Sequence, residues 1–185
     1  TGTLDGGNGL ANRISYAGFS SAATVNLETG VGSGVPSGFS NIQVFNGSSH
    51  ADTVIGFQAS SNYQFLSDGT FKVGGFEVGG FENLFAGSGN DTFAVAPGGG
   101  VSGLLHGGAG FDALTYENYG APVFVNLGAA NATGFSAIAG LERYLGSAFD
   151  DTFTGTSGDD TFTIHAANAG QVNGGSLFFS FEHLR

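Results

Sequence analysis

The chain has 185 residues, including 35 Gly and 19 Phe, and it contains no Cys, Met or Trp. The lack of sulfur excludes disulfides and thiolate metal sites, and no apolar run approaches the ~20 residues of a membrane-spanning helix. The net charge of -11 argues against binding to nucleic acid or to anionic lipid, because both require Lys and Arg.

The glycine content predicts short strands joined by turns. A glycine in a helix interior costs about 1 kcal/mol relative to alanine, and few windows of this sequence lack one. The 19 Phe and 5 Tyr are too many for a disordered chain, and the strict Gly-X-Y period of collagen is absent. We therefore expect an all-β protein.

The sequence repeats itself at an offset of about 100 residues. The matching segments are LDGGNGLANRISYAGFSSAATVNL (4–27) with LHGGAGFDALTYENYGAPVFVNL (105–127), and GGFEVGGFENL (74–84) with GGSLFFSFEHL (174–184). Internal repetition at fixed spacing is typical of solenoids, whose stacked repeats share one core. We expect a single continuous solenoid over residues 1–185, with repeat units 4–103 and 104–185, of which the second is incomplete.

A shorter pattern lies inside each unit: an apolar start, a turn of small residues, and then Asp-Thr followed by an apolar residue. It occurs in IQVFNGSSHADTV (42–54), FENLFAGSGNDTF (81–93) and LERYLGSAFDDTF (141–153). The turn positions in chain order are Asn12, Asp52, Asp91, Asp112 and Asp151, which are separated by near multiples of 20 residues. This spacing predicts about nine coils of about 20 residues, each with two or three short strands. Because parallel crossovers are almost always right-handed, we expect a right-handed parallel β-helix or β-roll.

Strands are predicted at 91–95, 122–127 and 160–164, each beginning at or near such a turn. Alternation in 122–127 places Val123, Val125 and Leu127 on one face. The Phe residues that follow Asp-Thr are expected in the core, whereas FFSF at 178–181 cannot point every ring inward.

Four turns carry a nine-residue motif related to Gly-Gly-x-Gly-x-Asp-apolar, and three of them have substitutions at its glycine positions. They are AGSGNDTFA (86–94), GGAGFDALT (107–115), GSAFDDTFT (146–154) and GTSGDDTFT (155–163). In these residues the chain resembles the RTX, or hemolysin-type calcium-binding, repeat family of secreted bacterial proteins. It is most similar to the long, repetitive β-strand proteins of that kind.

The resemblance implies a location outside the bacterial cell or on its surface, and Ca²⁺ as a cofactor. Calcium takes 6–8 oxygen ligands at about 2.3–2.6 Å, and in the family these come from turn carbonyls and Asp carboxylates of adjacent coils. The implied metal ligands are Asp91, Asp112, Asp151 and Asp160, with the turns shaped by glycines that include Gly107, Gly110, Gly155 and Gly158.

A second interpretation of the turn aspartates needs no metal. A family-type site needs two good turns stacked on the same side, and only 146–154 and 155–163 are in tandem, which should place them on opposite sides. An Asp in such a turn can instead accept hydrogen bonds from nearby backbone N–H groups. Both interpretations remain open at this level.

The sequence does not favour an enzyme. His50, His106, His165 and His183 share no metal-ligand spacing. The doublets Asp150-Asp151 and Asp159-Asp160 do not form catalytic carboxylate pairs by themselves, because adjacent residues on a strand point to opposite faces. No nucleophile elbow or phosphate-binding loop is present.

We expect a structural segment of a secreted or cell-surface repeat protein, such as an adhesin stalk, a matrix component or a filament component. One alternative is a subunit that assembles filaments by stacking end to end. Another is a non-catalytic or carbohydrate-binding module, in which exposed Phe or Tyr would bind surface glycans. The expected partners are like chains or flanking repeats, because neither end of the sequence resembles the polar cap that closes a solenoid.

Overall fold

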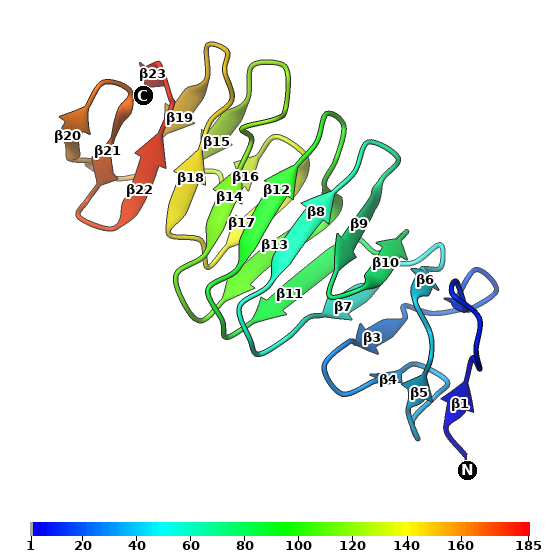
Figure 1. The fold of residues 1–185 in the computed structure, drawn as a ribbon. Coiled ribbons are helices and arrows are strands. Elements are labelled where there is room, and N and C mark those ends of the chain that lie inside the picture. Colours follow the sequence, from blue (N-terminus) through cyan, green and yellow to red (C-terminus); the bar gives the residue numbers. More distant parts are fainter. Residues whose placement is uncertain (1) are drawn as a thin grey trace.

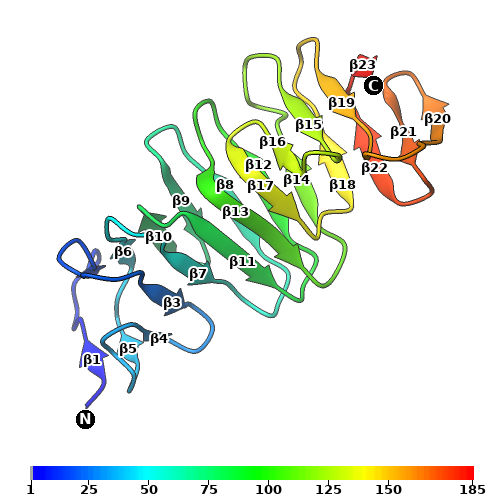
Figure 2. The same cartoon turned by 180° about the vertical axis from the view of Figure 1, so that it is seen from behind.

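The computed structural model describes residues 2–185, and within them it contains strands and turns without a helix. Two long sheets face each other along the molecule, and one hydrophobic core lies between them (Figures 1 and 2). The predicted all-β, parallel β-solenoid is therefore confirmed. The right-handed winding stays a prediction. No helix that could cross a membrane occurs in this part of the chain.

The first sheet has eleven strands. Their spatial order is β2 (Arg13–Ser15), β6 (Val44–Asn46), β10 (Phe76–Gly79), β9 (Thr70–Val73), β8 (Asn62–Phe65), β12 (Thr92–Val95), β14 (Ala113–Thr115), β18 (Arg143–Leu145), β22 (Ser176–Phe179), β21 (Ala169–Val172) and β20 (Phe162–Ala166).

The second sheet has ten strands and covers the other side of the core. Their spatial order is β23 (His183–Leu184), β19 (Thr152–Thr154), β15 (Phe124–Asn126), β16 (Asn131–Ala132), β17 (Phe135–Ala139), β13 (Val101–Gly108), β11 (Asn83–Gly87), β7 (Thr53–Ile55), β3 (Thr24–Asn26) and β4 (Val31–Gly32). A separate pair, β1 (Leu4–Asp5) with β5 (Phe39–Ser40), lies at the N-terminal end (Figure 1).

The predicted coil length of about 20 residues is wrong for most of the molecule. It holds once, where Leu84 lies beside Leu105 in the next coil, a separation of 21 residues. Elsewhere the separation is close to 30 residues, as for Val54 beside Leu84 and Leu114 beside Tyr144. The chain therefore makes about six turns of about 30 residues, and not nine shorter ones.

The longer coils arise from S-shaped excursions within one sheet. In the first of them, β9 pairs antiparallel with β8, and β10 then pairs antiparallel with β9. The other edge of β10 pairs in parallel with β6 of the preceding coil. The same path is followed by β15, β16 and β17 and by β20, β21 and β22 (Figure 1). Each excursion lengthens its coil by about ten residues, from about 20 to about 30.

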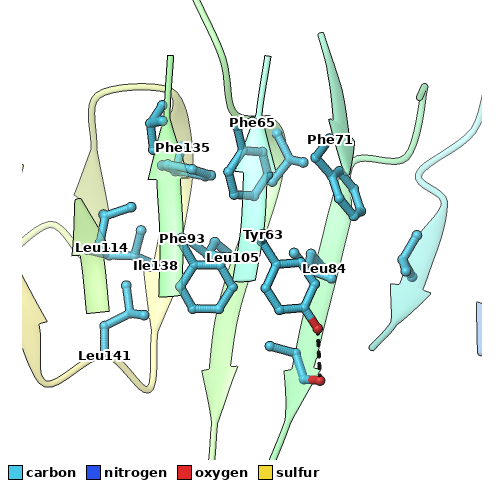
Figure 3. Packing of buried hydrophobic residues seen from close by; sticks show 14 of the residues in the cluster. Tyr63, Phe65, Phe71, Leu84, Phe93, Leu105, Leu114, Phe135, Ile138 and Leu141 are labelled. Carbon is cyan, nitrogen blue, oxygen red and sulfur yellow. Dashed lines mark hydrogen bonds between the residues drawn. The ribbon is translucent and has the colours of Figure 1, made fainter. Parts of the chain in front are cut away.

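The core consists of inward side chains stacked from coil to coil. Tyr63, Phe93 and Leu114 follow one another along the first sheet, facing Leu84 and Leu105 of the second (Figure 3). All five are fully buried, and the rings of Tyr63 and Phe93 stack with centroids 5.0 Å apart. Full burial of such a side chain contributes about 1.5–3 kcal/mol, so the two sheets are held together along their whole length.

The predicted strand faces agree with this core. Val123 and Val125 are buried and Leu127 is partly buried against the cluster. In the segment 178–181, Phe178 and Phe181 are buried, whereas Phe179 lies under the guanidinium of Arg143, whose Cζ is 4.9 Å from the ring centroid. One of the three rings thus lies outside the core, as the alternation argument requires.

Candidate calcium-binding turns

The turn aspartates occupy one recurring position, immediately before a strand. Asp91 precedes β12, Asp112 precedes β14, Asp151 precedes β19, and Asp52 precedes β7. All four side chains are 0 to 1% exposed. A buried carboxylate is costly unless it is hydrogen-bonded, so the partners of these oxygens decide what the turns do.

In the first sheet these carboxylates link successive coils. The main-chain N–H of Ser61 donates to Asp91 Oδ1 at 2.7 Å, and the N–H of Asp91 donates to Asp112 Oδ1 at 2.7 Å. The N–H of Asp112 donates in turn to Glu142 Oε2 at 2.8 Å. We name this arrangement the carboxylate ladder: the carboxylate before each strand accepts the N–H of the equivalent residue one coil earlier.

The second sheet carries the same ladder in two parts. Ala23 N–H donates to Asp52 Oδ1 at 2.6 Å, and Asp52 N–H donates to Glu82 Oε2 at 2.8 Å. Nearer the C-terminus, Val123 N–H donates to Asp151 Oδ1 at 2.7 Å and Asp151 N–H to Glu182 Oε2 at 2.9 Å. The ladder is therefore a property of the fold and is not confined to one turn.

At two turns both oxygens of the aspartate have protein donors. Asp52 Oδ2 accepts the N–H of Ser48, and Asp151 Oδ2 accepts the N–H of Ser147. The serine hydroxyls also donate to the Oδ1 atoms, at 2.9 Å in each case. These aspartates close their own turn and cap the preceding coil at the same time, which agrees with the metal-free interpretation of the motif.

Asp91 and Asp112 differ from the other two. In each, Oδ2 is buried without a hydrogen-bond partner among the described residues. Burial raises the pKa of Asp91 to about 6, and the neighbouring Asp112 carboxylate acts in the same direction. Burial also raises the pKa of Asp112, although the N–H of Asp91 and the charge of His106 act against it. Asp91 and Asp112 therefore each have one Oδ2 atom without a hydrogen-bond partner and a carboxyl group with a raised pKa.

Asp160, the fourth predicted ligand, lies apart from the others at the corner before β20. Its Oδ1 accepts hydrogen bonds from Thr156 Oγ1 at 2.8 Å and from Asn173 Nδ2 at 2.7 Å. Its side chain is partly exposed, unlike those of the four ladder aspartates.

The predicted turn glycines have different roles. Gly110 adopts a φ of +135°, which side chains rarely adopt. Gly107 is required by close packing, because a Cβ there would meet the Gly140 carbonyl oxygen of the next coil. A Cβ at Gly155 would meet the Asp160 carboxylate, whereas one at Gly158 would meet only Thr156 Oγ1, at 3.9 Å.

The structure does not gather the four predicted aspartates into one site. Asp91 and Asp112 are neighbours in the first sheet, Asp151 belongs to the second sheet, and Asp160 lies near the C-terminal end. Within residues 2–185, no group of three or more His, Cys, Asp or Glu side chains is placed to hold a metal ion. A cation at Asp91 and Asp112 would therefore need most of its oxygen ligands from the backbone or from water.

The nine-residue motif does not include the glutamates that end the ladders, Glu82, Glu142 and Glu182. Each follows a buried apolar residue, in the dipeptides Phe-Glu, Leu-Glu and Phe-Glu at 81–82, 141–142 and 181–182. The corresponding dipeptide at 42–43 is Ile-Gln, and Gln43 Oε1 accepts the N–H of Asn12 at 2.9 Å. This repeated apolar-acid pair is the sequence signal for the missing acceptor.

The described residues form a surface hollow on the first sheet. It has a volume of about 460 Å³ and lies over β6, β8, β9 and β10, with Leu10, Gln64, Lys72 and Glu77 in its lining. Lys72 Nζ and Glu77 Oε2 form an ion pair there at 3.4 Å. The most exposed Phe rings, those of Phe111, Phe124 and Phe149 among them, are not part of this lining.

Comparison of the chain with protein-family models, with curated proteins and with solved structures finds no match.

Proposed function

We propose that the chain is a structural segment of a secreted or cell-surface bacterial repeat protein, such as an adhesin stalk, a matrix component or a filament component. One observation carries the proposal: the two repeat units join without a break. β13 runs through the boundary between residues 103 and 104, and both sheets continue across it, through β11 with β13 and through β12 with β14. Repeats that stack on one another in this way can form a long, continuous rod.

The hydrogen bonds between coils support a mechanical role. Successive coils are joined by parallel strand pairs in both sheets and by the carboxylate ladder at the corners. A force along the solenoid axis would therefore load many of these bonds together. The net charge of -11 keeps neighbouring rods apart by mutual repulsion.

Calcium enters this proposal at one place. The carboxylates of Asp52 and Asp151 already have donors on both oxygens, which does not fit a role as metal ligands. Asp91 and Asp112 each keep one buried oxygen without a partner, and a hard divalent cation would neutralise both. We therefore assign the calcium-binding part of the proposal to this pair alone.

Light scattering and negative-stain microscopy test the structural role. We expect rods of one length and of monomer mass at every concentration. Fibres that lengthen with concentration would contradict a segment and support the alternative of a self-assembling filament subunit. Globular particles would contradict both.

A glycan array tests the remaining alternative, a carbohydrate-binding module. The hollow beside Lys72 and Glu77 favours that alternative because it offers polar side chains beside apolar ones. Glycan binding that is lost on Gln64→Ala and kept on Gln58→Ala, which lies outside the hollow, would replace the structural proposal.

A further inference from the structure

The outer edge of β20 is the open side of the first sheet at the C-terminal end of the solenoid. β20 is the last strand in the order of that sheet, and among residues 2–185 it pairs with β21 alone (Figure 1). Ile164 on this strand is 55% exposed, and Phe162 is only partly buried. An exposed strand edge with apolar side chains is a template for a further strand.

In the first repeat, the strand equivalent to β20 has a partner strand along the corresponding edge. β8 corresponds to β20, so that Tyr63 and Phe65 stand where Phe162 and Ile164 stand in the second repeat. Tyr63 and Phe65 are 0% and 1% exposed. There β12 runs beside them, with Phe93 opposite Tyr63 and Val95 opposite Phe65, and residues of the second sheet such as Ala86 and Phe135 contact them from across the core.

The strand that fills this edge also brings the ladder. Asp91, immediately before β12, accepts the N–H of Ser61. Asp160 occupies the position of Ser61 in the second repeat. A strand carrying Asp-Thr-Phe-x-Val would therefore present a carboxylate to the N–H of Asp160 when its apolar residues reach Phe162 and Ile164.

We propose that the outer edge of β20 docks a parallel strand of the β12 type, supplied by a further repeat of the same kind. This inference rests on the proposed function, because it treats the chain as one part of a stacked solenoid. In the docked state the Phe of the incoming strand lies opposite Phe162 and its second apolar residue lies opposite Ile164. The register is the one that β8 and β12 already show.

A second copy of this chain, stacked end to end, does not supply that strand. Its β12 is already held between β8 and β14. The strand at its N-terminal edge is β2, and Ile14 of β2 corresponds to Leu114 of β14, the strand that comes after β12. Direct stacking would therefore leave the first sheet one strand short at the junction.

The test is an extended chain in which residues 86–100, AGSGNDTFAVAPGGG, are copied after Arg185. We expect amide hydrogen exchange in β20 to slow by roughly tenfold or more, because its free edge becomes hydrogen-bonded. The matched control carries the same extension with the copies of Phe93 and Val95 replaced by Ser, and its β20 amides should exchange as in the original chain.

Two outcomes overturn the inference. One is β20 exchange that is equal in the original, extended and control chains. The other is end-to-end fibre formation by the original 185-residue chain, which would show that no β12-type strand is needed. Protected β20 amides in an extended chain that forms no rod would contradict the proposed function and leave the strand docking intact.

Discussion

The main-chain N–H of Asp112 donates to Glu142 Oε2 at 2.8 Å, although the two residues are 30 positions apart in the sequence. The bond joins adjacent coils at the corner before β14 and β18, where it continues the parallel pairing of these strands. Glu142 therefore has a structural role, because its carboxylate accepts the main-chain N–H of a residue in the neighbouring coil.

Glu142→Ala should destabilise the fold through this bond. The Asp112 N–H would lose its acceptor, and leaving a buried donor unsatisfied costs about 1–3 kcal/mol. Glu142→Gln keeps an acceptor oxygen and should cost less. Urea denaturation measures both changes, with Glu117→Ala as the exposed control, expected within about 0.5 kcal/mol of the original chain. Equal stabilities of the Ala and Gln variants would contradict the ladder.

Alanine substitution should destabilise the fold strongly at Gly107 and hardly at all at Gly158. Gly107→Ala would place a Cβ against the Gly140 carbonyl oxygen, so we expect a loss of about 1–3 kcal/mol from overpacking. Gly158→Ala has open space, with Thr156 Oγ1 3.9 Å away, and should be almost neutral. Thermal unfolding of both variants checks this, and a neutral Gly107→Ala would show that the coils can separate at that corner.

The raised pKa of Asp91 predicts that stability changes with pH. In the unfolded chain an Asp loses its proton near pH 4, whereas in the folded chain burial raises the pKa of Asp91 to about 6. Between these values the folded state holds a proton that the unfolded state has lost, so the contribution of Asp91 to the free energy of unfolding falls as pH rises. It should therefore increase when pH is lowered from 7 to 5.

Asp91→Asn isolates this contribution, because the amide is neutral at both pH values and its oxygen can still accept the Ser61 N–H. The difference in unfolding free energy between the original chain and Asp91→Asn, measured in urea, should change between pH 7 and pH 5. An identical difference at the two pH values would contradict an elevated pKa at this carboxyl group.

The calcium assignment predicts a metal effect that depends on two residues. Added Ca²⁺ should raise the melting temperature, and EDTA should lower it, because a ligand that binds only the folded state adds about 2.7 kcal/mol at a hundredfold excess over Kd. The double variant Asp91→Asn with Asp112→Asn should not respond. Melting curves of the original chain that are unchanged by EDTA would exclude a structural calcium ion.

The open edge of β20 predicts that alanine substitution destabilises the fold unequally at two equivalent strand positions, Phe65 and Ile164. Phe65→Ala in the first repeat should cost about 3–5 kcal/mol, because Phe65 is fully buried. Ile164→Ala in the second repeat should cost no more than about 0.5 kcal/mol, because the side chain is mostly exposed. Urea denaturation of the two variants measures this, and a large loss at Ile164 would mean that β20 is already covered in solution.

The sequence allowed the strand class, the stacked turns and the inward Phe residues to be predicted, but not the coil length. The spacing of Asp52, Asp91 and Asp112 measures how far apart equivalent turns lie along the chain. It does not specify which strands become neighbours, because an antiparallel return can place a strand one coil ahead. Gly74-Gly75 and Asn173-Gly174, with φ values between 52° and 87°, are the hairpin signals that mark two of these returns.

The candidate site was predicted in part for a similar reason. The nine-residue motif correctly places Asp91, Asp112 and Asp151 in turns, and all three are buried. It describes one turn at a time, however, and the acceptor for each turn's own N–H comes from the next coil. Glu142 and Glu182 therefore lie outside any template built on a single turn.

The S-shaped excursions also determine how the solenoid can lose stability. In a simple repeat stack each unit contacts only its neighbours, so stability is close to a sum of local terms. Here β8 belongs to one coil by sequence but pairs with β12 beyond it, while β10 of the same excursion pairs with β6 behind it. Removing 30 residues would take a strand from two coils at once. We therefore expect the repeat of about 100 residues, and not a single coil of about 30, to unfold as one cooperative unit.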